Sequence, residues 1–114
     1  MDPIRLNQAA KVLRALAHPV RLGVLQSLAG GEKTVTELYT ELGCSQSMMS
    51  QQLGILETQG LVQTRKAGVQ KYCTLGNSEF LHLLDCLDQH LARTPGAVSA
   101  TATPASGRAT RRKS

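Results

Sequence analysis

The segment from Cys44 to Val62 reads CSQSMMSQQLGILETQGLV and carries hydroxyl and amide groups where a solvated helix usually carries charges. Its polar side chains before Glu57 are Ser45, Gln46, Ser47, Ser50, Gln51 and Gln52. Glutamine can pair with an adenine edge through both amide groups, and serine can donate to or accept from any base. Carboxylates at these positions would be repelled by phosphates. The composition favours a surface that touches base pairs, and a merely polar, solvent-facing helix is the alternative.

A second cluster carries positive charge. Arg65, Lys66 and Lys71, together with Gln70, surround Gly68, so three cations fall within seven residues. Phosphate contacts from such side chains position a protein on DNA without reading its sequence. The cluster is therefore a candidate phosphate contact, and an ordinary charged hairpin is the alternative.

Four helices are expected ahead of the charged cluster, because apolar residues recur at helical intervals and Pro19 and Gly30-Gly31 interrupt them. Thr34 and Glu37 form a capping box at the start of the third helix. The expected helices are residues 4–17, 19–28, 34–43 and 45–59.

The third and fourth helices must meet at a sharp corner. Gly43 is placed as a C-cap and Ser45 as an N-cap, and only one residue separates them. Met49, Leu53 and Leu56 stand at i, i+4 and i+7 of the fourth helix and define its buried face. The Ser and Gln side chains therefore fall on its other faces.

After Gly60 the pattern changes to two short strands, starting at Leu61 and Val69, around a turn at Ala67-Gly68. A last helix opens at Asn77 or Ser78. The expected fold class is mainly α with a small β-hairpin, in the order α-α-α-α-β-β-α. This order is typical of a winged helix-turn-helix.

The last helix carries an apolar seam that needs a partner. Phe80, Leu84, Leu87 and Leu91 recur at spacings of four, three and four residues. A chain of this size cannot bury both terminal helices against so small a winged domain. A two-fold dimer would set two recognition helices about one DNA turn, roughly 34 Å, apart.

Three stretches resemble the ArsR/SmtB family of winged-helix repressors: AHPVRLGVLQSL, GCSQSMMSQQLGILETQGLV and VQKYCTL. The resemblance spans about residues 5–92. It implies a homodimer through the first and last helices, with Leu6 and Leu13 joining the seam. It also implies binding to a double-stranded DNA operator, expected to be an imperfect palindrome, from which an inducer releases the protein. The DNA-reading positions it implies are Ser45, Gln46, Ser47, Ser50 and Gln51. Gln52 follows them, where the family often has His.

Charge and composition divide the chain in two. Residues 1–93 hold nine Lys and Arg against eight Asp and Glu, and the rest of the net charge of +5 comes from Arg108, Arg111, Arg112 and Lys113. We expect one domain over residues 1–93 and a disordered basic tail over 94–114. No apolar run is long enough to cross a bilayer and no signal peptide is visible, so a cytoplasmic location is expected.

The sequence offers few side chains that could ligate a sensed metal ion. The third helix lacks the Cys-x-Cys pair that the resemblance associates with arsenic and cadmium sensors. Of the positions matching a zinc-type site, only Glu79 and His90 could ligate. His82 and Asp85, with His90, are weaker candidates that the polar face of an amphipathic helix explains equally well. No cofactor is expected; a metal ion or a thiol-modifying compound is the candidate inducer.

Thiol sensing is the other option. Cys44 adjoins the N-terminus of the fourth helix, where the helix dipole favours thiolate, and is the redox candidate. Sulfur-sensing relatives carry a cysteine on the second helix, where this chain has Gln26, so their cysteine pair is missing. Cys73 and Cys86 are expected to be structural.

No enzyme is predicted, because no nucleophile and base, phosphate-binding glycine loop or paired carboxylates stand in a recognisable frame. A winged-helix module that binds another protein instead of DNA is the remaining alternative. Acidic or apolar residues on the exposed face of the fourth helix would favour that alternative, and we expect neither there.

Overall fold

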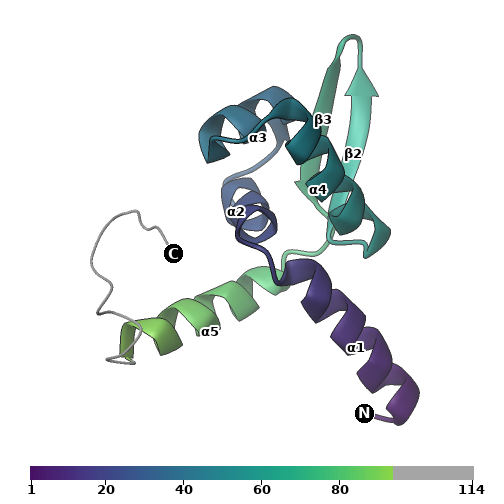
Figure 1. Cartoon of the computed structure of the whole chain (residues 1–114), viewed down its shortest axis with the longest axis vertical. Coiled ribbons are helices and arrows are strands. Elements are labelled where there is room, and N and C mark those ends of the chain that lie inside the picture. Colours follow the sequence, from purple (N-terminus) through teal and green to yellow (C-terminus); the bar gives the residue numbers. More distant parts are fainter. Residues whose placement is uncertain (94–114) are drawn as a thin grey trace. The chain divides into compact units, whose positions relative to one another are not determined.

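A computed structural model describes residues 1–93, and the basic tail predicted for residues 94–114 lies outside the described residues. Internal contacts divide the chain into two compact units, one spanning Met1–Leu81 and the other beginning at His82. The elements are α1 (Pro3–Leu16), α2 (Pro19–Leu28), β1 (Lys33–Thr34), α3 (Val35–Leu42), α4 (Gln46–Thr58), β2 (Val62–Ala67), β3 (Gln70–Leu75) and α5 (Phe80–Arg93) (Figure 1). The predicted fold class, a mainly helical winged helix-turn-helix, is confirmed.

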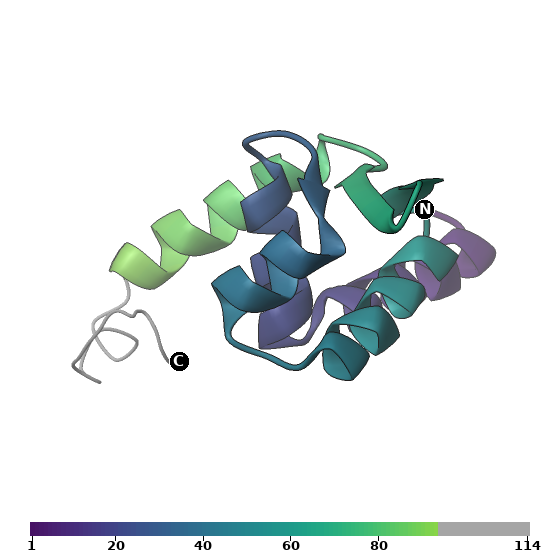
Figure 2. The same cartoon turned by 90° about the horizontal axis from the view of Figure 1, so that it is seen from above.

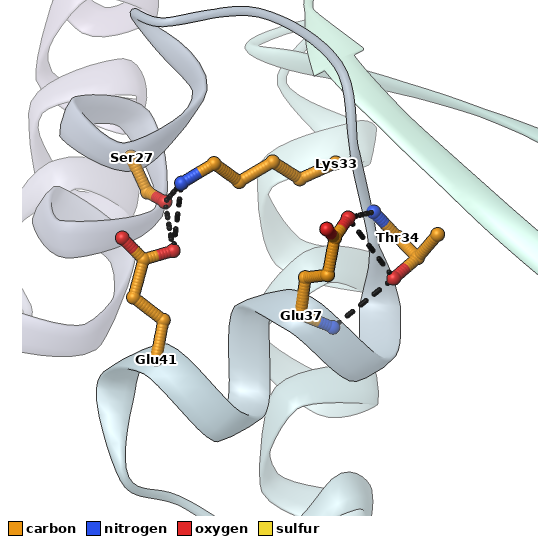
Figure 3. Close-up of polar contacts among 5 residues, drawn as sticks. All are labelled: Ser27, Lys33, Thr34, Glu37 and Glu41. Carbon is orange, nitrogen blue, oxygen red and sulfur yellow. Dashed lines mark hydrogen bonds and ion pairs between the residues drawn. The ribbon is translucent and has the colours of Figure 1, made fainter.

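Each helix of the first unit begins at a side chain that accepts a backbone N–H. Asp2 caps α1 and His18 caps α2, where its Nδ1 accepts the N–H of Val20 at 3.1 Å. The capping box of α3 is present: the N–H of Glu37 donates to Thr34 Oγ1 at 3.1 Å, and the N–H of Thr34 donates to Glu37 Oε1 at 2.8 Å (Figure 3). The capping box at Thr34 was predicted from the sequence, whereas the caps at Asp2 and His18 were not.

The corner between α3 and α4 has the predicted chemistry. Gly43 adopts a left-handed conformation with φ of 69°, which ends α3. The hydroxyl of Ser45 accepts the N–H of Met48 at 3.0 Å and starts α4. Figure 2 shows the two helices joined by this short connection.

The core of the first unit lies where α2, α3, α4 and the sheet meet. Leu25, Leu38, Met49 and Leu56 are among its fully buried side chains. Buried aliphatic side chains from all the central elements therefore fix how α4 is presented.

The sheet has one more strand than predicted. β1 pairs antiparallel with β3, and the strand order is β1-β3-β2. The turn also differs by one residue, because Ala67 pairs with Gln70 and leaves Gly68 and Val69 as the two-residue loop. Gly68 has φ of 64°, as such turns require, and Val69, predicted to lie in the second strand, is fully exposed.

A polar network joins α2, β1 and α3. Lys33 Nζ donates to Glu41 Oε1 at 2.8 Å and to Ser27 Oγ at 3.0 Å, and Ser27 Oγ donates to Glu41 Oε1 at 2.7 Å (Figure 3). The hydrogen bonds from Lys33 and then Ser27 lower the pKa of the Glu41 carboxyl. One carboxylate thereby connects α2 and β1 to α3, the first helix of the helix-turn-helix.

Candidate nucleic-acid interface

The two faces of α4 differ as the sequence predicts. Met49, Leu53 and Leu56 are buried, and Ile55 stands at the margin with 37% of its surface exposed. The predicted DNA-reading residues Ser45, Gln46, Ser47, Ser50 and Gln51 are all exposed. The exposed surface of α4 before Glu57 is therefore uncharged and consists of hydroxyl and amide groups together with Met48, which is 37% exposed. The expected absence of apolar residues from this face is wrong for Met48.

Gln52 does not belong to this surface. Only 7% of it is exposed, its Nε2 donates to Met48 Sδ at 3.2 Å, and its Oε1 has no hydrogen-bond partner within residues 1–93. Its place between Met49 and Leu56, three residues from one and four from the other, could have predicted this burial. Ser45 is only partly available to DNA, because its hydroxyl oxygen accepts the N–H of Met48 as the cap of α4.

Alternation along the hairpin separates its cations onto two faces. Thr64 pairs with Cys73 and Lys66 pairs with Lys71, so these four residues share one face of the sheet. That face is turned toward α4, because Thr64 Oγ1 donates to Glu57 Oε2 of α4 at 2.7 Å and Cys73 is buried. Lys66 and Lys71 thus lie on the α4 side of the hairpin, which projects past α4 in Figure 1.

Lys66 and Lys71 stand directly opposite each other, an arrangement in which like charges repel. Across the part of the chain that the structure describes, neither lysine forms an ion pair with a carboxylate. Gln70 beside them is exposed. The end of the hairpin therefore carries uncompensated positive charge.

Arg65 has a different environment. It lies on the opposite face of β2, where its Nε and Nη2 donate to Oε2 and Oε1 of Glu32 at 3.2 and 2.9 Å. Its guanidinium also stacks 4.6 Å from the centre of the Tyr72 ring. Arg65, predicted as a phosphate contact together with the lysines, is thus already paired with a carboxylate that lies 33 residues earlier in the chain.

The three cysteines are all thiols in different surroundings. Cys44 is half-buried, Cys73 is buried and Cys86 is exposed. Burial raises the pKa of the Cys73 thiol to about 11, so it stays protonated at neutral pH. The structural role predicted for Cys73 fits this burial, whereas Cys86 is not a core residue of the single chain.

The metal candidates on α5 do not gather within one chain. No group of three His, Cys, Asp or Glu side chains that could hold a metal occurs among residues 1–93. His82, Asp85 and His90 are all exposed. A site built from them would need ligands from a second chain.

The predicted dimer residues lie on exposed or half-buried surface of α1 and α5. Leu6 and Leu13 on α1 are each 54% exposed, and Leu87 and Leu91 on α5 are 45% and 52% exposed. Phe80 and Leu84 are half-buried, and none of the residues Phe80–Arg93 is buried.

No helix formed by residues 1–93 has the length and apolar character to cross a membrane.

Known proteins match this chain over most of its length. Residues 18–64 match the model of a family described as bacterial regulatory protein, arsR family. The biofilm growth-associated repressor of Xylella fastidiosa is 39% identical over 83 residues, which cover 73% of each chain. The transcriptional activator HlyU of Vibrio cholerae is 38% identical over 80 residues, covering 70% of this chain and 74% of its own.

A solved structure gives the same fold. The homodimeric winged helix-turn-helix DNA-binding domain from Mycobacterium bovis superposes with a TM-score of 0.71 at 32% identity, covering 80% of this chain and 88% of that one. The family model covers α2, α3 and α4 and ends within β2. The chain belongs to the arsR family of bacterial regulatory proteins.

Proposed function

We propose that the chain is a transcriptional repressor that binds double-stranded DNA as a homodimer, with α4 in the major groove and the end of the wing against phosphates. The observation that carries this proposal is the exposed face of α4, where Ser45, Gln46, Ser47, Ser50 and Gln51 present no charge. Such a face can approach base edges without repelling the phosphates on either side of the groove.

The roles divide along α4 and the wing. Gln46 and Gln51 can each pair with an adenine edge, and Ser47 and Ser50 can bond to either partner of a base pair. The N-terminal N–H groups of α4 favour a nearby phosphate. Lys66 and Lys71 repel each other, and a phosphate between them would relieve that repulsion, so we assign them and Gln70 to the DNA backbone.

Self-association supplies the second half of the DNA contact. Leu6 and Leu13 on α1 and Leu87 and Leu91 on α5 expose apolar surface that a second copy would cover. A two-fold dimer presents two copies of α4 about one DNA turn, roughly 34 Å, apart. The operator is then an imperfect palindrome.

A gel-shift assay tests this function on the DNA upstream of the chain's own gene at two salt concentrations. We expect sequence-specific binding that weakens steeply with salt, because phosphate contacts release counterions. A chain that prefers no DNA sequence would instead support a winged-helix module that binds protein. Since one relative is named an activator, a promoter-reporter assay with and without the chain then establishes the direction of regulation.

Release by an inducer is the remaining part of the proposal. Cys44 lies at the corner before α4, so adding bulk or charge to its thiol would disturb the DNA-reading surface. We expect an oxidant to release DNA from the wild-type chain and not from Cys44→Ser. If Cys44→Ser is released equally well, the thiol proposal fails, and release by added zinc in the same assay would favour His82, Asp85 and His90.

A further inference from the structure

The wing is supported by a third strand only at its base. β1 contributes two residues, which pair with Cys73 and Tyr72 of β3. Tyr72 also pairs with Arg65 of β2, so Thr34, Tyr72 and Arg65 form the last row that spans all three strands. Beyond this row the hairpin continues to its turn as two strands, which alone are marginally stable.

An ion pair joins this last row to the residue before β1. Arg65 lies across the Tyr72 ring and reaches Glu32, the residue before β1, with two of its nitrogens on two carboxylate oxygens. A bidentate pair fixes direction as well as distance. The pair therefore connects the outer strand β2 to the β1 side of the sheet, over the strand between them.

The residue next to Glu32 holds the helix-turn-helix. Lys33 Nζ bonds to Ser27 of α2 and Glu41 of α3 (Figure 3). Two consecutive residues thus bond in two directions, Glu32 to the wing and Lys33 to the helices that support α4. This segment is a second polar connection between the two elements assigned to DNA, beside the direct bond from Thr64 Oγ1 of β2 to Glu57 of α4.

We propose that Glu32 is a positioning residue for DNA binding: by holding Arg65 at the last supported row, it fixes the direction in which the wing presents Lys66 and Lys71. The inference rests on the proposed function. Arg65 lies on the face of β2 opposite to Lys66, so its part is to orient the hairpin. A hairpin held in place before binding has less freedom to lose when both elements engage DNA together.

The direction in which one substitution changes DNA affinity separates this role from general electrostatics. Glu32→Gln removes a negative charge beside a DNA-binding element and leaves Arg65 at most one neutral acceptor, so electrostatics alone predicts tighter binding and a steeper salt dependence. The positioning role predicts binding weakened by about threefold to fivefold, the upper part of the range expected from one exposed pair, with the salt slope unchanged.

Two double variants with the net charge of the wild type serve as matched controls. Glu32→Arg with Arg65→Glu can re-form the pair, whereas Glu32→Ala with Arg65→Ala cannot. Binding is measured by fluorescence anisotropy on a duplex that the wild-type chain selects from a random-sequence pool. We expect the charge-swapped variant to bind within about twofold of wild type and the neutral variant to bind as weakly as Glu32→Gln.

Each outcome decides the proposal. Tighter binding by Glu32→Gln, or equal binding by the two double variants, would overturn it. Thermal unfolding of every variant shows whether the chain is folded at the assay temperature, so a loss of binding is not mistaken for unfolding. If the wild-type chain selects no duplex from the pool, the proposed function fails first; selection followed by a wrong sign at Glu32 overturns the positioning role alone.

Discussion

The helices α4 and α5 have similar lengths, but they use their apolar residues differently. α4 buries Met49, Leu53 and Leu56 within the single chain and leaves uncharged polar groups outside. α5 is amphipathic, yet none of its residues is buried and Leu87 and Leu91 remain exposed. The buried face of α4 is covered by its own chain, whereas α5 leaves apolar side chains exposed.

The comparison distinguishes two kinds of exposed surface. An exposed face of Ser and Gln costs little in water and suits a polar, charged ligand. An exposed row of leucines is unfavourable in water and suits another apolar surface. We therefore expect substitutions on α5 to act through association between chains, and substitutions on the outer face of α4 to act through DNA.

The largest effect is expected for Leu87→Glu. The side chain is exposed in the single chain, so a charge there costs little, but in a dimer the charge would be buried without a partner. We expect the dimer dissociation constant to rise by about 100-fold or more, and DNA affinity to fall because the two half-sites are no longer linked. Analytical ultracentrifugation measures the first effect and anisotropy the second.

Gln89→Glu is the matched control, because it adds the same charge at an exposed position on the opposite side of α5. It should leave the mass in solution unchanged. If Leu87→Glu has the same mass in solution as the wild type, the leucines of α5 have no role in association between chains, and the proposed difference between α4 and α5 is wrong.

The next effect concerns the outer face of α4. Gln51→Ala should weaken binding to the selected duplex by about tenfold or more, because a bidentate base contact contributes about 1–3 kcal/mol of discrimination. Binding to an unrelated duplex should hardly change. Gln63→Ala, an exposed glutamine on β2, is the control, and an equal loss on both duplexes from Gln51→Ala would mean that this residue reads no base.

A smaller effect is expected for the neighbouring glutamine. Gln52→Leu replaces a buried amide whose Oε1 lacks a partner within the described chain, so the free energy of unfolding should stay equal or rise by up to about 1 kcal/mol. Urea denaturation measures this change. Destabilisation by more than about 1 kcal/mol would show that the amide is fully hydrogen-bonded in solution. Gln52 would then stabilise the core through its polar groups and not only by filling space.

The smallest effect is a dependence on pH. Hydrogen bonds from Lys33 and Ser27 lower the pKa of Glu41, so its contribution to stability is complete above the ordinary value of 4.5 and is lost as pH falls through the lower folded value. The difference in unfolding free energy between wild type and Glu41→Gln should be present at neutral pH and fade below about pH 4. A difference that is independent of pH would exclude an ionic role for Glu41.

Local signals account for most of what the sequence predicted. Caps such as Thr34 and Ser45 act on backbone groups a few residues away, and the stripe of Met49, Leu53 and Leu56 follows from helix geometry. Both can therefore be read from neighbouring letters. The helices, the corner between α3 and α4, and the exposed face of α4 all followed from such signals.

The missed features depend on contacts between distant residues. β1 is two residues long and exists because Lys33 and Thr34 pair with β3, some 40 positions later. The pairing of Arg65 with Glu32 spans 33 positions. Val69 favoured a strand by its type, but the register of Ala67 with Gln70 places it in the turn. None of these could be read from local spacing.

The burial of Cys73 has a practical consequence for observing the molecule. A reagent that modifies thiolates at neutral pH would leave this cysteine unlabelled, so Cys86→Ser would give a chain with one dye-accessible position, at Cys44. A fluorophore there would sit just before the first turn of α4, and in the proposed dimer energy transfer between two labelled copies would report the separation of their α4 helices in the absence of DNA.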